Sequence, residues 1–356
     1  SGCGETPYIK LLTQLYGDRM LIANATGCSS IYGGNLPSTP YTTDANGRGP
    51  AWANSLFEDN AEFGLGFRLT VDQHRQRVMR LLAQFADKLP PELNDALHAE
   101  ATPKVRREQI AELRKVLANE EGAKELLTDA DALVEKSIWL IGGDGWAYDI
   151  GFGGLDHVLS LTENVNILVL DTQCYSNTGG QASKATPLGA VTKFGEHGKR
   201  KARKDLGVSM MMYGHVYVAQ ISLGAQLNQT VKAIQEAEAY PGPSLIIAYS
   251  PCEEHGYDLA LSHDQMRQLT ATGFWPLYRF DPRRADEGKL PLALDSRPPS
   301  DALAETLLNE QRFRRLNAQQ PEVAEQLWKD ATADLQKRYD FLAQLAGKAE
   351  KPTTES

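Results

Sequence analysis

Two polar segments contain the residues whose types and spacing could do chemistry. Residues 143–145 read GDG, and residues 171–177 read DTQCYSN. The Asp144 carboxylate, the Thr172 hydroxyl and one main-chain carbonyl would make a suitable oxygen set for Mg²⁺, which keeps its other positions for water and phosphate oxygens. The sequence therefore predicts a magnesium diphosphate site.

The elements that must position these segments are two short apolar runs, residues 137–141 (SIWLI) and 165–170 (VNILVL). Such runs are typical of parallel strands buried on both faces. Asp144 and the second polar segment would then follow two strand ends at the edge where open α/β sheets bind ligands. We expect the glycines around Asp144, at 142, 143 and 145, to let the backbone approach a phosphate. The alternative for Asp144 is a helix N-cap or a tight turn.

Composition and charge restrict the class of protein. The chain has 356 residues, 42% of them hydrophobic, and a formal net charge of -9. The overall charge repels an anionic cofactor, so local N–H groups and a metal must reverse it. It also argues against nucleic acid as a partner. No apolar run approaches the roughly 18 residues of a membrane span, and we expect a cytoplasmic protein.

Longer motifs closely resemble the thiamine-diphosphate domain of the pyruvate:ferredoxin (flavodoxin) oxidoreductase family. They are GGDGWAYDIGFGGLDHVLS and NILVLDTQCYSNTGGQASKATPLGA, with GCGETPYIKLL, NATGCSSIYGGNLPSTPYTT and SLIIAYSPC, so the resemblance covers about residues 1–285. It implies an α/β, thiamine-diphosphate-binding fold with a mainly parallel sheet and flanking helices. In the wider superfamily this position is usually Asn. The Thr172 of this chain instead resembles the pyruvate:ferredoxin (flavodoxin) oxidoreductase family at this position.

The same resemblance implies a set of site residues. Asp144, the Thr172 side chain and the Cys174 main-chain carbonyl are similar to the family's magnesium ligands. Asn177 is similar to the catalytic residue that approaches the substrate near the thiazolium; from spacing alone it could equally be a loop-stabilising Asn. The thiamine-diphosphate site would comprise Glu5, Cys28, Gly143, Asp144, Gly145, Trp146, Thr172, Gln173, Cys174, Tyr175, Ser176 and Asn177. The alternative for Glu5 is helix capping.

The four cysteines divide into two groups. Cys3, Cys28 and Cys252 lie in segments that resemble the family's ligands for a [4Fe-4S] cluster. The thiol of Cys174 is expected to point away from the magnesium loop into packing, as buried free cysteines commonly do. The family's first cluster ligand would precede Ser1, so we expect a fragment of a larger polypeptide without a stable cluster of its own.

The function implied by the resemblance is oxidative decarboxylation of pyruvate to acetyl-CoA and CO₂. Electrons would pass through [4Fe-4S] clusters to ferredoxin or flavodoxin, in a homodimer that needs the remaining domains of the full-length enzyme. We expect the chain alone not to turn over pyruvate. The alternatives are a different 2-oxo acid such as 2-oxobutyrate, a nucleotide binder that uses residues 142–154 as a phosphate loop, and a purely electron-carrying iron–sulfur protein.

The rest of the chain predicts the domain organisation. Residues 1–298 form the thiamine-diphosphate and proximal cluster domain, with a helical insertion at about 71–136, and residues 299–356 form a helical C-terminal extension and tail. Helices are expected at 7–15 and 225–239, strands at 19–25, 215–221 and 244–249, and a glycine turn at residues 33–34.

Three further features have ordinary structural explanations. The basic run at 199–204 (KRKARK) is expected to be a solvated loop, with docking of an acidic electron carrier as the alternative. His157 and His255 lack a partner at zinc-ligand spacing, so both are expected to be surface or core histidines.

Overall fold

The computed structural model describes residues 2–300 and 302–348, in which eight strands form one sheet. Its order is β2-β1-β3-β4-β6-β5-β7-β8. In this order, the six strands from β2 to β5 pair in parallel. β7 pairs antiparallel with β5, and β8 pairs antiparallel with β7. The strands are β1 (Met20–Ala25), β2 (Ala51–Ser55), β3 (Ser137–Gly142), β4 (Asn166–Asp171), β5 (Tyr217–Ile221), β6 (Ser244–Tyr249), β7 (Tyr278–Phe280) and β8 (Leu292–Leu294).

The central strands β3, β4 and β6 are buried along their whole length, as their apolar sequences predict. Successive side chains point to opposite faces, so each strand contributes to two apolar cores. Trp139 and Ile141 meet α1 and α10 on one face. Ile138 and Leu140 meet the remaining sheet-packed helices on the other. The sheet is therefore covered on both sides, which confirms the predicted α/β class.

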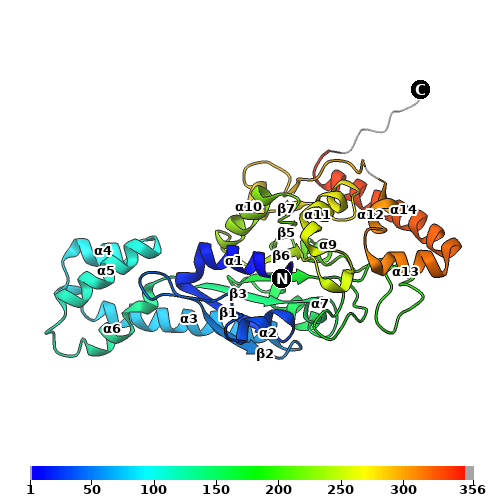
Figure 1. Cartoon of the computed structure of the whole chain (residues 1–356). Helices are drawn as coiled ribbons and strands as arrows, with labels where there is room; N and C mark the ends of the chain where they lie inside the picture. The colour runs from blue at the N-terminus through cyan, green and yellow to red at the C-terminus, as the bar shows by residue number, and fades with distance from the viewer. Residues whose placement is uncertain (1, 301, 349–356) are drawn as a thin grey trace, which may run out of the picture.

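The helices connect and cover the strands in chain order (Figure 1). They are α1 (Thr6–Tyr16), α2 (Cys28–Gly34), α3 (Asn60–Ala83), α4 (Pro91–His98), α5 (Pro103–Val116), α6 (Lys124–Asp129), α7 (Asp144–Tyr148), α8 (Phe152–Ser160), α9 (Leu206–Met211), α10 (Leu227–Glu238), α11 (Ser262–Ala271), α12 (Leu303–Leu307), α13 (Gln311–Gln319) and α14 (Pro321–Leu345). Residues 33–34 end α2, so the glycine turn predicted there is wrong.

The long helix α3 belongs to two parts of the molecule. It begins at Asn60, earlier than the helical pattern predicted, and near its start Gly64 packs so closely that a Cβ would lie 2.2 Å from Leu140 Cγ. Its second half contributes Val78 and Leu82 to a separate core formed with α4, α5 and α6. These three helices lie at the end of the molecule away from the sheet (Figure 1).

The C-terminal helices α12, α13 and α14 lie at the opposite end of the molecule (Figure 1). Phe313, Leu316, Trp328 and Leu342 are buried in the same core as the sheet's larger face. The helices predicted within 299–356 are therefore part of the packed structure, and residues 349–356, where the predicted tail ends, lie outside the described residues. No helix in the described ranges is both long and apolar enough to cross a bilayer.

Candidate functional site

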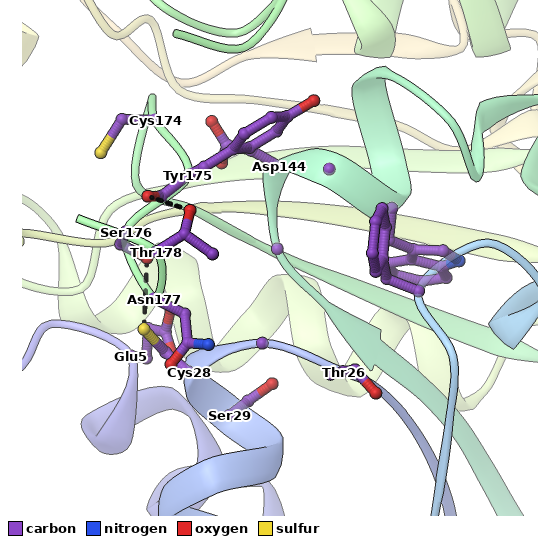
Figure 2. Close-up of a pocket in the computed structure, with 15 residues that line it drawn as sticks. Glu5, Thr26, Cys28, Ser29, Asp144, Cys174, Tyr175, Ser176, Asn177 and Thr178 are labelled. Carbon is purple, nitrogen blue, oxygen red and sulfur yellow. Dashed lines mark hydrogen bonds between the residues drawn. The ribbon is translucent and has the colours of Figure 1, made fainter. Parts of the chain in front are cut away.

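A cavity lies at the carboxyl ends of β1, β3 and β4. After β1, the chain first adds β2 on one side of it and then adds β3 on its other side. The strand order therefore reverses between β1 and β3. Open α/β sheets bind ligands at such a point. Figure 2 shows the lining segments, which come from the N-terminal loop, α2, the start of α7 and the loop after β4. The residues that line the cavity are Glu5, Thr26, Gly27, Cys28, Ser29, Phe57, Gly143, Asp144, Gly145, Trp146, Cys174, Tyr175, Ser176, Asn177 and Thr178.

The three groups predicted to bind magnesium are next to one another. β3 and β4 are neighbours, and the backbone N–H of Thr172 donates to Asp144 Oδ1 at 3.2 Å. Thr172 Oγ1 donates to the Cys174 carbonyl oxygen at 3.0 Å. Asp144 makes no capping hydrogen bond in α7, because its carboxylate reaches across to the next strand. The N-cap alternative for Asp144 is therefore wrong.

Ser183 and His255 hold this arrangement from outside, and no motif in the sequence indicated either role. Ser183 Oγ donates to Asp144 Oδ2 at 2.7 Å. His255 is fully buried, and its Nε2 donates to the Thr172 carbonyl at 2.7 Å. Burial, together with the charge of Arg312, lowers the pKa of His255 and keeps the ring neutral. His255 is thus the core histidine that was expected, and His157 is exposed as expected.

A buried ion pair lies directly behind the proposed magnesium ligands. Asp171 is fully buried, and Arg203 Nη2 donates to its Oδ2 at 2.6 Å. Tyr148 donates to the same oxygen at 2.5 Å. Burial and the neighbouring charge of Asp171 raise the pKa of Asp144 well above its ordinary value. A cation at Asp144 would reverse that shift, so the donor set fits a hard divalent ion.

Glu5 lines the other side of the cavity. It is only 4% exposed and precedes α1, but its side chain makes no capping hydrogen bond. Glu5 therefore occupies the N-cap position of α1, as the capping alternative predicted, without a hydrogen bond from its side chain. Burial, followed by the charge of Cys252, raises the pKa of Glu5 to about 8. Its Oε2 and the indole Nε1 of Trp146, also in the lining, have no hydrogen-bond partner among the described residues. Buried polar atoms without partners are rare in folded proteins, so both fit a polar ligand.

The structure also places the remaining predicted residues of the cavity. Asn177 is exposed and lines it, on the same loop as Tyr175 and Ser176. Cys28, at the start of α2, is joined to Ser176 by a hydrogen bond of 3.3 Å between Sγ and Oγ (Figure 2). Two predicted residues, Thr172 and Gln173, are buried and absent from the lining. Gly142 was expected to let the backbone approach a phosphate. A Cβ on Gly142 would lie 2.5 Å from the Trp146 ring, so packing against this ring requires the glycine.

The thiol of Cys174 is buried, as expected. Interaction with Cys252, followed by burial, raises the pKa of Cys174, and the same interaction lowers the pKa of Cys252. Among the described residues, no three His, Cys, Asp or Glu side chains are arranged to hold a metal ion. Cys3, Cys28 and Cys252 thus do not form a ready cluster site.

The basic run at 199–204 is not a simple solvated loop. Lys199 Nζ donates to the carbonyls of Ser183, Lys184 and Thr186. Arg203 points inward to Asp171. Lys199 and Arg203, two of the six residues of the basic run, therefore position the segments around the cavity. A run of charges alone does not indicate which side chains face inward.

The family model for the C-terminal TPP-binding domain of thiamine pyrophosphate enzymes matches residues 122–248. This range includes Asp144 and the whole loop after β4. A solved 2-oxoglutarate:ferredoxin oxidoreductase from Magnetococcus marinus aligns over 75% of each chain at 15% identity, with a TM-score of 0.42. That similarity is too low to support any assignment of residues.

Curated relatives match the chain along its length. It is 91% identical over 355 residues to a probable pyruvate-flavodoxin oxidoreductase of Escherichia coli K12, covering 100% of this chain and 30% of the relative. It is 56% identical to the pyruvate-flavodoxin oxidoreductase of Rhodospirillum rubrum, covering 98% of this chain and 30% of the relative, and 48% identical to the pyruvate:ferredoxin oxidoreductase of Moorella thermoacetica, covering 97% and 31%. Over its whole length the chain therefore corresponds to about 30% of a pyruvate-flavodoxin (pyruvate:ferredoxin) oxidoreductase, and its residues 122–248 match the C-terminal TPP-binding domain of thiamine pyrophosphate enzymes.

Proposed function

We propose that this chain binds Mg²⁺ and thiamine diphosphate in the cavity at the ends of β1, β3 and β4. The observation that supports this most directly is the contact between the two neighbouring strand ends. The Thr172 hydroxyl lies within hydrogen-bond distance of the Cys174 carbonyl, and the Asp144 carboxylate accepts from the Thr172 backbone N–H. These are the hard oxygen donors that Mg²⁺ prefers, and phosphate oxygens would complete its coordination.

The remaining lining residues have roles that follow from their chemistry. The backbone of residues 143–146 begins α7 at the cavity and would face the diphosphate. Glu5 brings a buried carboxyl group with an unpartnered oxygen, suited to a hydrogen bond with a polar ring. Asn177 is exposed at the cavity, and its amide would hydrogen-bond the negative charge that develops on the substrate. Bound thiamine diphosphate supplies the carbanion chemistry that removes CO₂ from a 2-oxo acid.

The whole enzyme to which this chain corresponds would oxidise pyruvate to acetyl-CoA and CO₂ and pass electrons to flavodoxin or ferredoxin. The names of the relatives support this proposal. The homodimer, and the [4Fe-4S] cluster at Cys3, Cys28 and Cys252, stay predictions.

Calorimetric titration with thiamine diphosphate, with and without Mg²⁺, tests the proposed site. The wild-type chain should bind only when Mg²⁺ is present. Asp144→Ala removes a ligand oxygen and should weaken that binding at least tenfold. Asp264→Ala is the matched control, because it removes the same charge from an exposed position of α11. Binding that ignores both Mg²⁺ and Asp144, or preference for NAD or ATP, would contradict the proposal.

A further inference from the structure

Gln173 has a backbone conformation that its residue type does not favour. Its φ is +62°, in the left-handed region, where residues other than glycine pay a steric cost. It lies between Thr172 and Cys174, the two residues whose oxygens are proposed to face one cation. Across this residue, Thr172 Oγ1 lies 3.0 Å from the Cys174 carbonyl oxygen. The shape of the proposed magnesium loop therefore depends on this residue.

Three buried hydrogen bonds hold Gln173 in place. Its N–H donates to Asp171 Oδ1 at 3.1 Å, and its carbonyl accepts from Thr186 Oγ1 at 2.7 Å. Its side-chain Oε1 accepts from Arg312 Nη2 at 2.7 Å. The first two bonds come from residues close in the sequence. The third comes from α13, 139 residues away, and fixes the side chain.

Arg312 is itself fixed in a buried network. It is 5% exposed, and its Nε donates at 2.6 Å to Glu310, which is fully buried. The other oxygen of Glu310 accepts from Gln265 Nε2 at 2.8 Å. The backbone carbonyl of Arg312 accepts from the Val191 N–H at 2.8 Å. Two nitrogens of the guanidinium are thus occupied, Nε by Glu310 and Nη2 by Gln173.

A buried ion pair of this kind adds little stability by itself, because desolvation of the two charges offsets their attraction. What Arg312 adds is geometry. Its planar fork can donate in two fixed directions at once, which a Lys cannot do. We infer that Arg312 is a positioning residue for the proposed Mg²⁺ site, because it holds Gln173 left-handed so that Thr172 and Cys174 face one cation. This inference rests on the proposed function and adds to it a residue that does not touch the cavity.

The experiment measures the Mg²⁺ affinity of the full chain at saturating thiamine diphosphate, by titration calorimetry, with unfolding in urea measured in parallel. Arg312→Met should weaken Mg²⁺ binding by about 10- to 100-fold, the usual effect of removing an outer partner of a metal ligand. Gln173→Met loses the same hydrogen bond from the other side and should weaken it to the same degree. Arg315→Met, exposed on the same helix, should leave affinity unchanged.

Gln173→Gly supplies the decisive background. Glycine adopts positive φ without steric cost, so the loop should keep its shape without help from Arg312. Arg312→Met should then change Mg²⁺ affinity less than threefold when added to Gln173→Gly. If Arg312→Met does not fold, Arg312→Lys takes its place in both backgrounds, since it keeps a charge beside Glu310 but cannot form both contacts.

Three outcomes separate the possibilities. Loss of stability without loss of Mg²⁺ affinity in Arg312→Met would make this residue merely structural and overturn the inference. An equal loss of affinity in both backgrounds would also overturn it, because the effect would not pass through Gln173. Absence of Mg²⁺-dependent thiamine diphosphate binding in the wild type would instead refute the proposed function itself.

Discussion

Removal of the Arg203 guanidinium tests how the buried charges beside the cavity are balanced. Asp171 has a side-chain exposure of 0% and Arg203 of 15%, with 2.6 Å between Nη2 and Oδ2. Asp171 would keep its hydrogen bond from Tyr148 in Arg203→Met but would lose the guanidinium. The neighbouring Asp144 carboxylate would then add repulsion.

The expected magnitude follows from the depth of the pair. Breaking a buried ion pair from one side costs about 3–5 kcal/mol, because one charge is left uncompensated. Removing both charges costs much less, since no unpaired charge remains. We therefore expect Arg203→Met to lose about 3–5 kcal/mol of unfolding free energy, and Arg203→Met combined with Asp171→Asn to lose about 1 kcal/mol or less.

Urea denaturation followed by circular dichroism, without Mg²⁺ or thiamine diphosphate, measures both values. Asp171→Asn alone completes the double-mutant cycle and gives the coupling free energy of the pair. The reasoning is refuted if Arg203→Met costs less than about 1 kcal/mol, or if the double mutant loses the sum of the two single losses. Either result would mean that water or another group compensates Asp171.

Two further predictions use the same measurement. Gly64→Ala should lower the free energy of unfolding by about 1–3 kcal/mol, because the new Cβ would lie 2.2 Å from Leu140 Cγ. Gly66→Ala, on the same helix, meets nothing within 4 Å and should raise the free energy of unfolding by about 0.5–1 kcal/mol. Equal effects of the two substitutions would contradict this packing. Asp205 is partly buried, which raises its pKa, but Arg338 at 2.6 Å and a backbone N–H outweigh this and hold the pKa below its ordinary 3.8. The stabilisation by Asp205 is therefore present above about pH 4 and is lost as pH falls through the lower pKa of the folded state. Asp205→Asn should make the free energy of unfolding depend less on pH in this acidic range. An unchanged pH dependence would contradict the assignment.

Much of the fold could be predicted from the sequence because its central strands are locally encoded. The apolar runs at 137–141 and 165–170 indicated buried parallel strands, and both are central strands of the sheet. The strand at 244–249 was predicted with its observed bounds. Segments whose structure depends on tertiary contacts were less accurate. The α2 helix has two serines and two glycines among its seven residues, and a glycine turn was predicted at its end, residues 33–34.

The candidate site divides in the same way. The sequence by itself determined that Asp144 and the segment at 171–177 follow neighbouring strands, since parallel strands present their carboxyl ends at one edge of a sheet. The role of Gln173 was not predictable, because a positive φ outside glycine has no signature in the sequence.

Only the tertiary structure decided which polar side chains support the site. Ser183, Arg203, His255 and Arg312 reach it from loops and a helix after β4, and the contact of Cys174 with Cys252 joins two strand ends. The physical reason is that a polar side chain's partner is selected when both groups are buried together. Hydrophobic periodicity locates the strands, but it does not specify which distant donor will satisfy a buried oxygen.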